Sequence, residues 1–346
     1  MMNAEAQKNM PANPAPDASP PFSAVRFIYR YGLLVVLLLM IVVFSIKQPF
    51  FGTFSNAMFI LQASSIVAVV GLGCTISMTV GGFDLAVGAT MSLTVMVAAS
   101  AMVIHNLSGP AAILLGLGAG LAVGLLNAAM VVLARIPDLV ATLATLFLIN
   151  GMTLLGVSGQ SVAEGMSVNG VTAPGSFSPV FRWLGSGSVA GIHACVIVAG
   201  VVFLAVFALL NFTRWGRVLY AVGGNPIAAR AVGIRVARYK VLAYMLSGLL
   251  AAIAGLLLVA QSNRGDVSVG DAYLLQAVSS ALVGYAVLGA NKPNAFGTLI
   301  GAIFVATLIN GLTMFNLPYY AQTFVQGVLL AVALLMSYTL GPTRKR

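Results

Sequence analysis

Long apolar runs separated by short polar segments dominate this chain. Residues 48–134 contain no Asp, Glu, Lys or Arg apart from Asp84, and residues 293–343 contain none at all. A helix needs about 20 apolar residues to cross the ~30 Å hydrocarbon layer of a membrane. Division of the runs at Gly, Pro and Asn predicts about ten membrane-spanning helices, near residues 31–50, 57–80, 85–104, 111–134, 138–156, 189–211, 241–260, 272–290, 295–316 and 320–340.

These spans predict an all-α, polytopic membrane protein with one membrane domain over residues 31–341. Residues 1–30 begin with a stretch rich in Pro, Ala and Asn, which predicts a disordered cytoplasmic tail. No small-residue cleavage pattern follows the first apolar run, so we do not expect a cleavable signal peptide. Residues 342–346 form a basic C-terminus, expected in the cytoplasm. The longest outer loop is residues 157–188 and the longest inner loop is residues 212–240.

The basic residues predict how the chain is oriented. An even number of spans places both termini on the same side of the membrane. With the termini in the cytoplasm, 14 of the 17 Lys and Arg residues fall in inner segments, and only Lys47, Arg182 and Arg264 fall in outer ones. Cytoplasmic loops carry such an excess of positive charge. We therefore expect a multi-pass protein of the inner (plasma) membrane with both termini inside.

Composition then excludes several classes of protein. The chain has 346 residues, of which 60% are hydrophobic and 7% are charged, and its mean hydropathy is +1.02. A soluble domain has roughly a quarter charged residues, so an ordinary soluble enzyme is excluded. The two cysteines, Cys74 and Cys195, lie in apolar runs and do not indicate a disulfide scaffold. Topology explains the net charge of +10 without nucleic acid as a partner.

The polar residues show no catalytic or metal-binding pattern. No lysine lies in a P-loop context, and His105 and His193 have no ligand spacing with the cysteines. We therefore expect no enzymatic activity, no catalytic residues, no metal and no cofactor bound by this chain. Ion-coupled carriers usually keep ionisable residues at mid-membrane, where this chain has almost none. This favours energy delivered through the cytoplasmic face over a secondary carrier or a passive channel.

Residues 81–88 (GGFDLAVG) interrupt two strongly apolar runs. Two adjacent glycines break a helix, and Asp84 is placed to cap the next helix. One interpretation is a tight turn between helices near the membrane surface. The other is a broken helix whose backbone, with Gly82, Phe83 and Asp84, faces a translocation path.

Residues 223–234 (GGNPIAARAVGI) predict a two-turn helix within the inner loop. Asn225 is a preferred N-cap, Pro226 suits the first helical position and Gly233 suits the end. Alanines on such a helix permit close docking into a partner, whereas the alternative is an ordinary surface loop. The candidate coupling residues are Gly223, Gly224, Asn225, Pro226, Ala228, Ala229, Arg230 and Gly233.

Three amides lie inside apolar spans: Asn127, Asn150 and Asn310. Each is expected to hydrogen-bond between helices or to line a polar path for a hydroxylated solute. Small residues four apart permit close helix packing within the subunit. They are Gly116, Gly120 and Gly124, and again Gly297 and Gly301.

Four segments together resemble the permease subunits of bacterial ABC importers for sugars of the ribose, xylose, galactose and arabinose type. The similarity covers essentially the whole chain apart from the tail, and the pairing of the first and third segments is specific. The segments are, in order, GGFDLAVG at 81–88, PDLVATLATLFLINGMTLL at 137–155, AVGGNPIAARAVGI at 221–234 and LSGLLAAIAGLLL at 246–258.

The resemblance implies a ten-helix subunit that pairs with a second permease, as a homodimer or a heterodimer, within membrane lipid. It implies two cytoplasmic ATP-binding domains on separate chains, which use the ATP, and an external sugar-binding protein. By analogy, residues 223–234 would be the coupling helix and the Asp84 segment would lie beside the central path. The alternatives are a permease for a branched-chain amino acid, a nucleoside or a signalling molecule.

One segment departs from the family pattern. After the eighth span the family usually has a Gly- and Ser-rich stretch, whereas residues 284–294 here read GYAVLGANKPN. Only Gly284, Leu288 and Gly289 fit it loosely. The segment is expected to be an inner turn, where the change would affect partner contacts more than the choice of solute.

Overall fold

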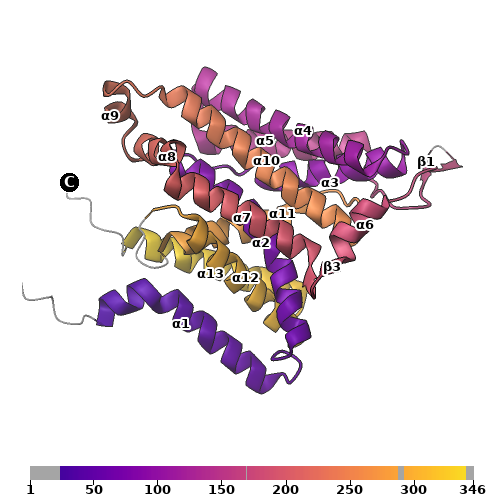
Figure 1. Cartoon of the computed structure of the whole chain (residues 1–346), viewed down its shortest axis with the longest axis horizontal. Helices are drawn as coiled ribbons and strands as arrows, with labels where there is room; N and C mark the ends of the chain where they lie inside the picture. The colour runs from indigo at the N-terminus through magenta and orange to yellow at the C-terminus, as the bar shows by residue number, and fades with distance from the viewer. Residues whose placement is uncertain (1–23, 169, 287–291, 340–346) are drawn as a thin grey trace, which may run out of the picture.

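The computed structural model describes residues 24–168, 170–286 and 292–339, and that part of the chain is almost entirely helical (Figure 1). The helices before the largest loop are α1 (Ala24–Lys47), α2 (Phe54–Thr79), α3 (Val87–Val103), α4 (Gly109–Ala128), the π-helix η1 (Ala129–Leu133) and α5 (Asp138–Gly156). Those that follow are α6 (Pro179–Ser186), α7 (Ala194–Phe212), α8 (Arg214–Gly224), α9 (Pro226–Ala231), α10 (Val236–Ser262), α11 (Gly270–Ala286), α12 (Ala295–Met314) and α13 (Tyr319–Thr339). Two antiparallel hairpins pair β1 (Ser167–Val168) with β2 (Val171–Thr172), and β3 (Ser188–Val189) with β4 (Ile192–His193).

A helix occupies each of the ten predicted spans. Within the described residues, six helices are long and apolar enough to cross a membrane: α2, α4 continued by η1, α5, α7, α10 and α12. The other predicted spans contain α1, α3, α11 and α13. The all-α, polytopic class is therefore confirmed, whereas the full count of ten spans stays a prediction.

The boundaries differ from the predicted ones in two places. Helix α1 begins at Ala24, so the last part of the predicted disordered tail is helical. An apolar run marks where a helix enters hydrocarbon, and without Gly or Pro the helix continues beyond it. Residues 189–193, predicted to begin a span, instead belong to the β3–β4 hairpin, whose turn contains Gly191 at φ +82°. Residues 1–23 and the basic C-terminus at 342–346 lie outside the described part.

The connections between helices gather at two ends of the bundle, with α8 and α9 at one and β1 and β3 at the other (Figure 1). We call these the α8–α9 end and the hairpin end. At the hairpin end, the backbone amides of Val162 and Gly265 each donate to the other's carbonyl, at 2.8 and 2.7 Å. At the α8–α9 end, the Tyr220 hydroxyl donates to the Pro293 carbonyl at 2.7 Å.

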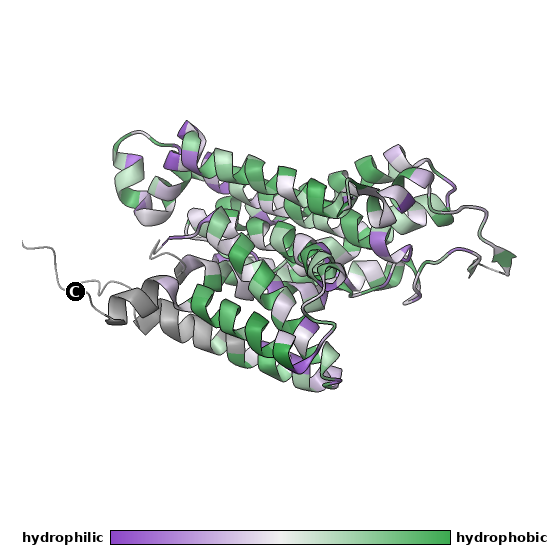
Figure 2. Cartoon of the chain, turned by 60° about the horizontal axis from the view of Figure 1, so that its bottom comes forward, coloured by the Kyte–Doolittle hydropathy of each residue, from purple (hydrophilic) through white to green (hydrophobic). Residues whose placement is uncertain are grey.

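Hydropathy follows this division. Hydrophobic residues cover the lengths of the helices, and hydrophilic residues concentrate towards the two ends (Figure 2). Lys47, Arg182 and Arg264 lie at the hairpin end, while the α8–α9 end holds more of the described basic residues. These are Arg135, Arg214, Arg217, Arg230, Arg235, Arg238, Lys240 and Lys292.

Helix α10 runs through the core and packs against α2, α3 and α4. The contact with α4 is close because small residues line it. A Cβ atom added to Gly120 would collide with the backbone of Gly248, and one added to Gly124 would lie 2.9 Å from the Cα of Met245. The predicted packing role of the α4 glycines is therefore confirmed for this pair of helices.

A valine at Gly120 is expected to lower the free energy of unfolding by about 1–3 kcal/mol, because the side chain would force α4 and α10 apart. Gly118 provides the matched control on the same helix, since a Cβ there would meet nothing within 4 Å. Thermal unfolding of the two purified variants in detergent checks the expectation. Equal melting temperatures for Gly120→Val and Gly118→Val would contradict it.

Candidate functional site

Helix α9 forms where the sequence predicts a capped helix. The Asn225 side chain accepts hydrogen bonds from the backbone amides of Ile227 and Ala228, both at 3.0 Å. Pro226 occupies the first turn, and Gly233 follows the helix in the left-handed region at φ +83°. The local interpretation of this segment as a short helix is therefore confirmed, and an irregular surface loop is excluded.

The outward face of α9 is not the predicted alanine face. Ala229 is only 4% exposed and packs into the main hydrophobic core, whereas Ile227 and Val232 are each 76% exposed. Ala228 is exposed as predicted for a docking residue. So short a helix can bury only one side against its own protein, and Ala229 is the small residue on that side. The prediction that Ala229 docks against a partner is therefore wrong. The large apolar side chains of this segment that are open to a partner are Ile227 and Val232.

The two motifs of residues 81–88 and 223–234 lie in direct backbone contact. Helix α2 ends at Thr79, and Gly81 turns the chain at φ +75°. Gly223, near the end of α8, lies against this turn so closely that an added Cβ would collide with the Thr79 carbonyl and lie 2.8 Å from the Gly81 nitrogen. A Cβ on Gly82 would collide with the Tyr244 hydroxyl of α10. The glycines therefore permit α8, α2 and α10 to meet at one point.

Asp84 is the centre of a buried hydrogen-bond cluster and is only 2% exposed. Its Oδ2 accepts from the Ser247 hydroxyl of α10 at 2.7 Å. Its Oδ1 accepts from the backbone amide of Ala86 at 2.9 Å and from the Asn127 side-chain amide of α4 at 3.3 Å. We call these residues the Asp84 cluster. It joins the turn after α2 to two helices far away in the sequence.

The predicted capping role of Asp84 is wrong in its position. Ala86 is the N-cap residue of α3, and among the described residues no side chain makes the capping hydrogen bond there. Asp84 bonds the amide two residues further on, which is the pattern of an Asx turn placed before the helix. The residue therefore fixes the turn, and its remaining acceptor capacity is used by α4 and α10.

Further polar contacts tie the same turn to α5. The Thr142 hydroxyl donates to the Phe83 carbonyl at 3.2 Å. Asp138, in the first turn of α5, forms an ion pair with Lys240, in the second turn of α10, at 3.4 Å. Of the predicted path residues, Gly82, Phe83, Asp84 and Asn127 are thus brought together at one place near the α8–α9 end.

Asn150 and Asn310 lie elsewhere. Asn310 is buried in α12, and its Oδ1 has no hydrogen-bond partner in the described part of the chain. The Asn150 amide of α5 donates to Asp271 Oδ1, in the first turn of α11, at 3.1 Å. Asp271 was not among the predicted site residues, although an acidic residue directly before the apolar span 272–290 was a usable signal. Asp271 is exposed, whereas Asn150 is half-buried and its Oδ1 is buried without a hydrogen-bond partner in the described part of the chain.

The divergent segment contacts α8. Within residues 284–294, the stretch 287–291 lies outside the described part, but Lys292 Nζ lies 4.9 Å from the centre of the Tyr220 ring. Tyr220 also donates to Pro293, as described above. Burial raises the pKa of Tyr220 to about 12, so the phenol keeps its proton and its donor role at physiological pH. Lys292 and Pro293 of this segment therefore lie at the α8–α9 end, next to the predicted coupling residues.

Comparison with known proteins supports a transport assignment. Residues 56–334 match the family described as the branched-chain amino acid transport system / permease component. The ribose import permease protein of Escherichia coli (strain K12) is 35% identical over 303 residues, which cover 88% of this chain and 92% of that protein. The ribose import permease protein of Haemophilus influenzae is 31% identical over 92% of this chain and 96% of its own length. The D-allose transport system permease protein of Escherichia coli (strain K12) is 30% identical, over 90% and 93%. No solved structure matches the chain.

Proposed function

This chain belongs to the family described as the branched-chain amino acid transport system / permease component, and we propose that it is the membrane subunit of an importer that carries a monosaccharide into the cytoplasm. ATP hydrolysis by cytoplasmic partner subunits would drive the cycle, and an external binding protein would deliver the sugar. The sugar assignment is supported by the relatives named for ribose and D-allose. The excess of basic residues at the α8–α9 end supports placing that end in the cytoplasm.

The observation that carries the proposal is the contact between Gly223 and the turn after Thr79. In the proposed cycle, the ATPase binds α9 through Ile227 and Val232 and moves it when ATP is bound. Because backbone touches backbone at Gly223, a shift of α8 reaches the turn with no side chain in between. The Asp84 cluster then passes the shift to α4 and α10. Two packed arrangements of these helices would give the inward-facing and outward-facing states.

The solute would pass along an outer face of this subunit rather than through its core. The Asp84 cluster is closed in by packed helices, so its role is to position them. The Asn150–Asp271 pair joins α5 to α11, and the exposed carboxylate of Asp271 is a group that hydrogen-bonds sugar hydroxyls. A second permease copy, or a sister permease, would close the other side of this path.

The test compares Gly223→Ala with Gly224→Ala. A methyl group at Gly223 would press on the Thr79 carbonyl, whereas one at Gly224 would meet nothing within 4 Å. We expect Gly223→Ala to lower the amount of sugar taken up per ATP hydrolysed by at least about fivefold, the low end of common coupling energies. Gly224→Ala should leave this ratio unchanged.

The measurement uses vesicles containing the full importer, with labelled ribose or allose and a parallel phosphate-release assay. Equal transport ratios for the two variants would contradict the coupling route through Gly223. Absence of uptake of any monosaccharide by the unmodified importer would contradict the sugar assignment separately.

A further inference from the structure

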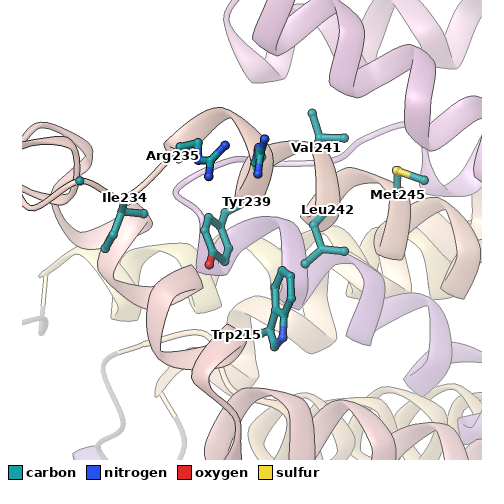
Figure 3. Close-up of a pocket in the computed structure, with 9 residues that line it drawn as sticks. Trp215, Ile234, Arg235, Tyr239, Val241, Leu242 and Met245 are labelled. Carbon is teal, nitrogen blue, oxygen red and sulfur yellow. The ribbon is translucent and has the colours of Figure 1, made fainter.

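A cavity of about 530 Å³ lies between α8 and the beginning of α10, outside the Asp84 cluster (Figure 3). Its wall changes character along α10. Arg235 and Arg238 line it at the start of the helix, Tyr239 follows, and Leu242 and Met245 line it one to two turns further on. The figure shows Arg235 and Tyr239 towards one side and Leu242 and Met245 towards the other. The cavity is therefore cationic at one end and apolar at the other.

Within the described part of the chain, the two arginines have no ionic partner. Arg235 is the N-cap residue of α10, Arg238 lies in its first turn, and both line the cavity. Among the described residues, neither guanidinium forms an ion pair or a hydrogen bond, whereas nearby Lys240 is paired with Asp138. Both side chains are exposed. Two adjacent unpaired guanidinium groups make a site for a doubly contacted anionic oxygen group such as a phosphate.

The middle and the far end of the cavity have the features of a membrane interface. The rings of Trp215 and Tyr239 lie 5.6 Å apart between centroids, tilted at 52°, and Trp215 is half-exposed. Such aromatic residues concentrate at the level of lipid headgroups. Leu242 and Met245 belong to a helix that is long and apolar enough to span a membrane. A soluble acidic peptide would leave this apolar part of the wall without an apolar group packed against it.

We propose that this cavity binds one anionic phospholipid from the leaflet at the α8–α9 end. The phosphate contacts Arg235 and Arg238, the glycerol region lies against Trp215 and Tyr239, and an acyl chain lies along Leu242 and Met245. Because the cavity is bounded by both α8 and α10, the bound lipid holds the start of α10 against α8. Basic pockets between helices at a charged leaflet are suited to anionic headgroups.

The test measures binding of phosphatidylglycerol and phosphatidylcholine to the purified full chain, by native mass spectrometry and by the lipid-induced rise in melting temperature. We expect the double variant Arg235→Gln/Arg238→Gln to retain phosphatidylglycerol roughly thirtyfold less well than the unmodified chain, since each arginine near an anionic surface contributes about 1 kcal/mol. Phosphatidylcholine binding should not change. The matched control is Arg214→Gln/Arg217→Gln, which removes the same charge from α8 outside the cavity wall.

Several outcomes would overturn the proposal. One is equal retention of both lipids by the unmodified chain, and another is an equal loss of phosphatidylglycerol in the control variant. If inorganic phosphate alone produced the same rise in melting temperature, the site would be one for free phosphate. If the double variant changed only assembly with the ATPase, the cavity would be a protein-docking site. Arg235→Lys/Arg238→Lys, which keeps the charge but loses the paired guanidinium contacts, should restore only part of the lipid binding.

Discussion

Replacement of Ile227 and Val232 by glutamate is expected to separate the chain from its ATPase and to abolish ATP-driven uptake. Both side chains are 76% exposed, although they are large and apolar. In the proposed complex they enter a groove of the partner, where two carboxylates would be buried without partners. The expected loss is at least about 2 kcal/mol of binding free energy, or roughly thirtyfold in affinity. Copurification of the ATPase and uptake of labelled sugar measure the two effects.

The matched control places the same charge on an equally exposed apolar residue at the other end. Val171, in the β1–β2 hairpin, is 71% exposed, so Val171→Glu should keep the ATPase bound. None of the three side chains is packed in the core, so all three substitutions should leave folding intact. Full retention of the ATPase by the Ile227→Glu/Val232→Glu variant would show that α9 is not the docking element.

Replacement of Asp84 by alanine is expected to have the second large effect. It would leave the Ser247 hydroxyl, the Asn127 amide and the Ala86 backbone amide without their acceptor. A buried polar group without a partner costs about 1–3 kcal/mol, so we expect a loss of about 2–4 kcal/mol in the free energy of unfolding. Uptake should fall as well, because α4 and α10 lose their connection to the turn after α2. Assembly with the ATPase should persist, since α9 is untouched.

Asp84→Asn separates the shape of the side chain from its charge. Asparagine keeps an acceptor for Ala86 and Asn127, and its amide can donate to the Ser247 oxygen. We therefore expect this variant to lie within about 1 kcal/mol of the unmodified chain. Thermal unfolding in detergent and sugar uptake are the measurements. If Asp84→Ala equalled the unmodified chain in both, the cluster would connect nothing of functional importance.

Much of the fold could be predicted because membrane helices are specified locally. A span needs only a long apolar run, so a helix occupies every predicted span. The α9 helix could be predicted equally well, because Asn225 caps it through the backbone amides two and three residues further along the chain. The ends of helices and the short strands were predicted less well where they lie outside the predicted membrane spans. Helix α1 extends back to Ala24, and the β3–β4 hairpin depends on pairing between short strands.

The candidate site could be predicted only in part, because its contacts join distant residues. Asp84 and Asn127 were each recognised as unusual, but nothing local predicts that they share a hydrogen bond or that Ser247 completes the cluster. The contact of Gly223 with Thr79 could not be predicted for the same reason. On α9, residue type alone did not predict that Ala228 is exposed and Ala229 is buried. Which side of a six-residue helix is buried depends on the residues of the protein that it packs against.

The π-helix η1 directly follows the segment of α4 that contains Asn127. A π turn holds one residue more than an α turn at the same point of the axis. Loss of one residue within 129–133 could therefore be absorbed by a change to regular α-helix, while a deletion before Asn127 would rotate the preceding part of α4 by about 100° against α10. We therefore expect length differences between related permeases along α4 to fall within residues 129–133.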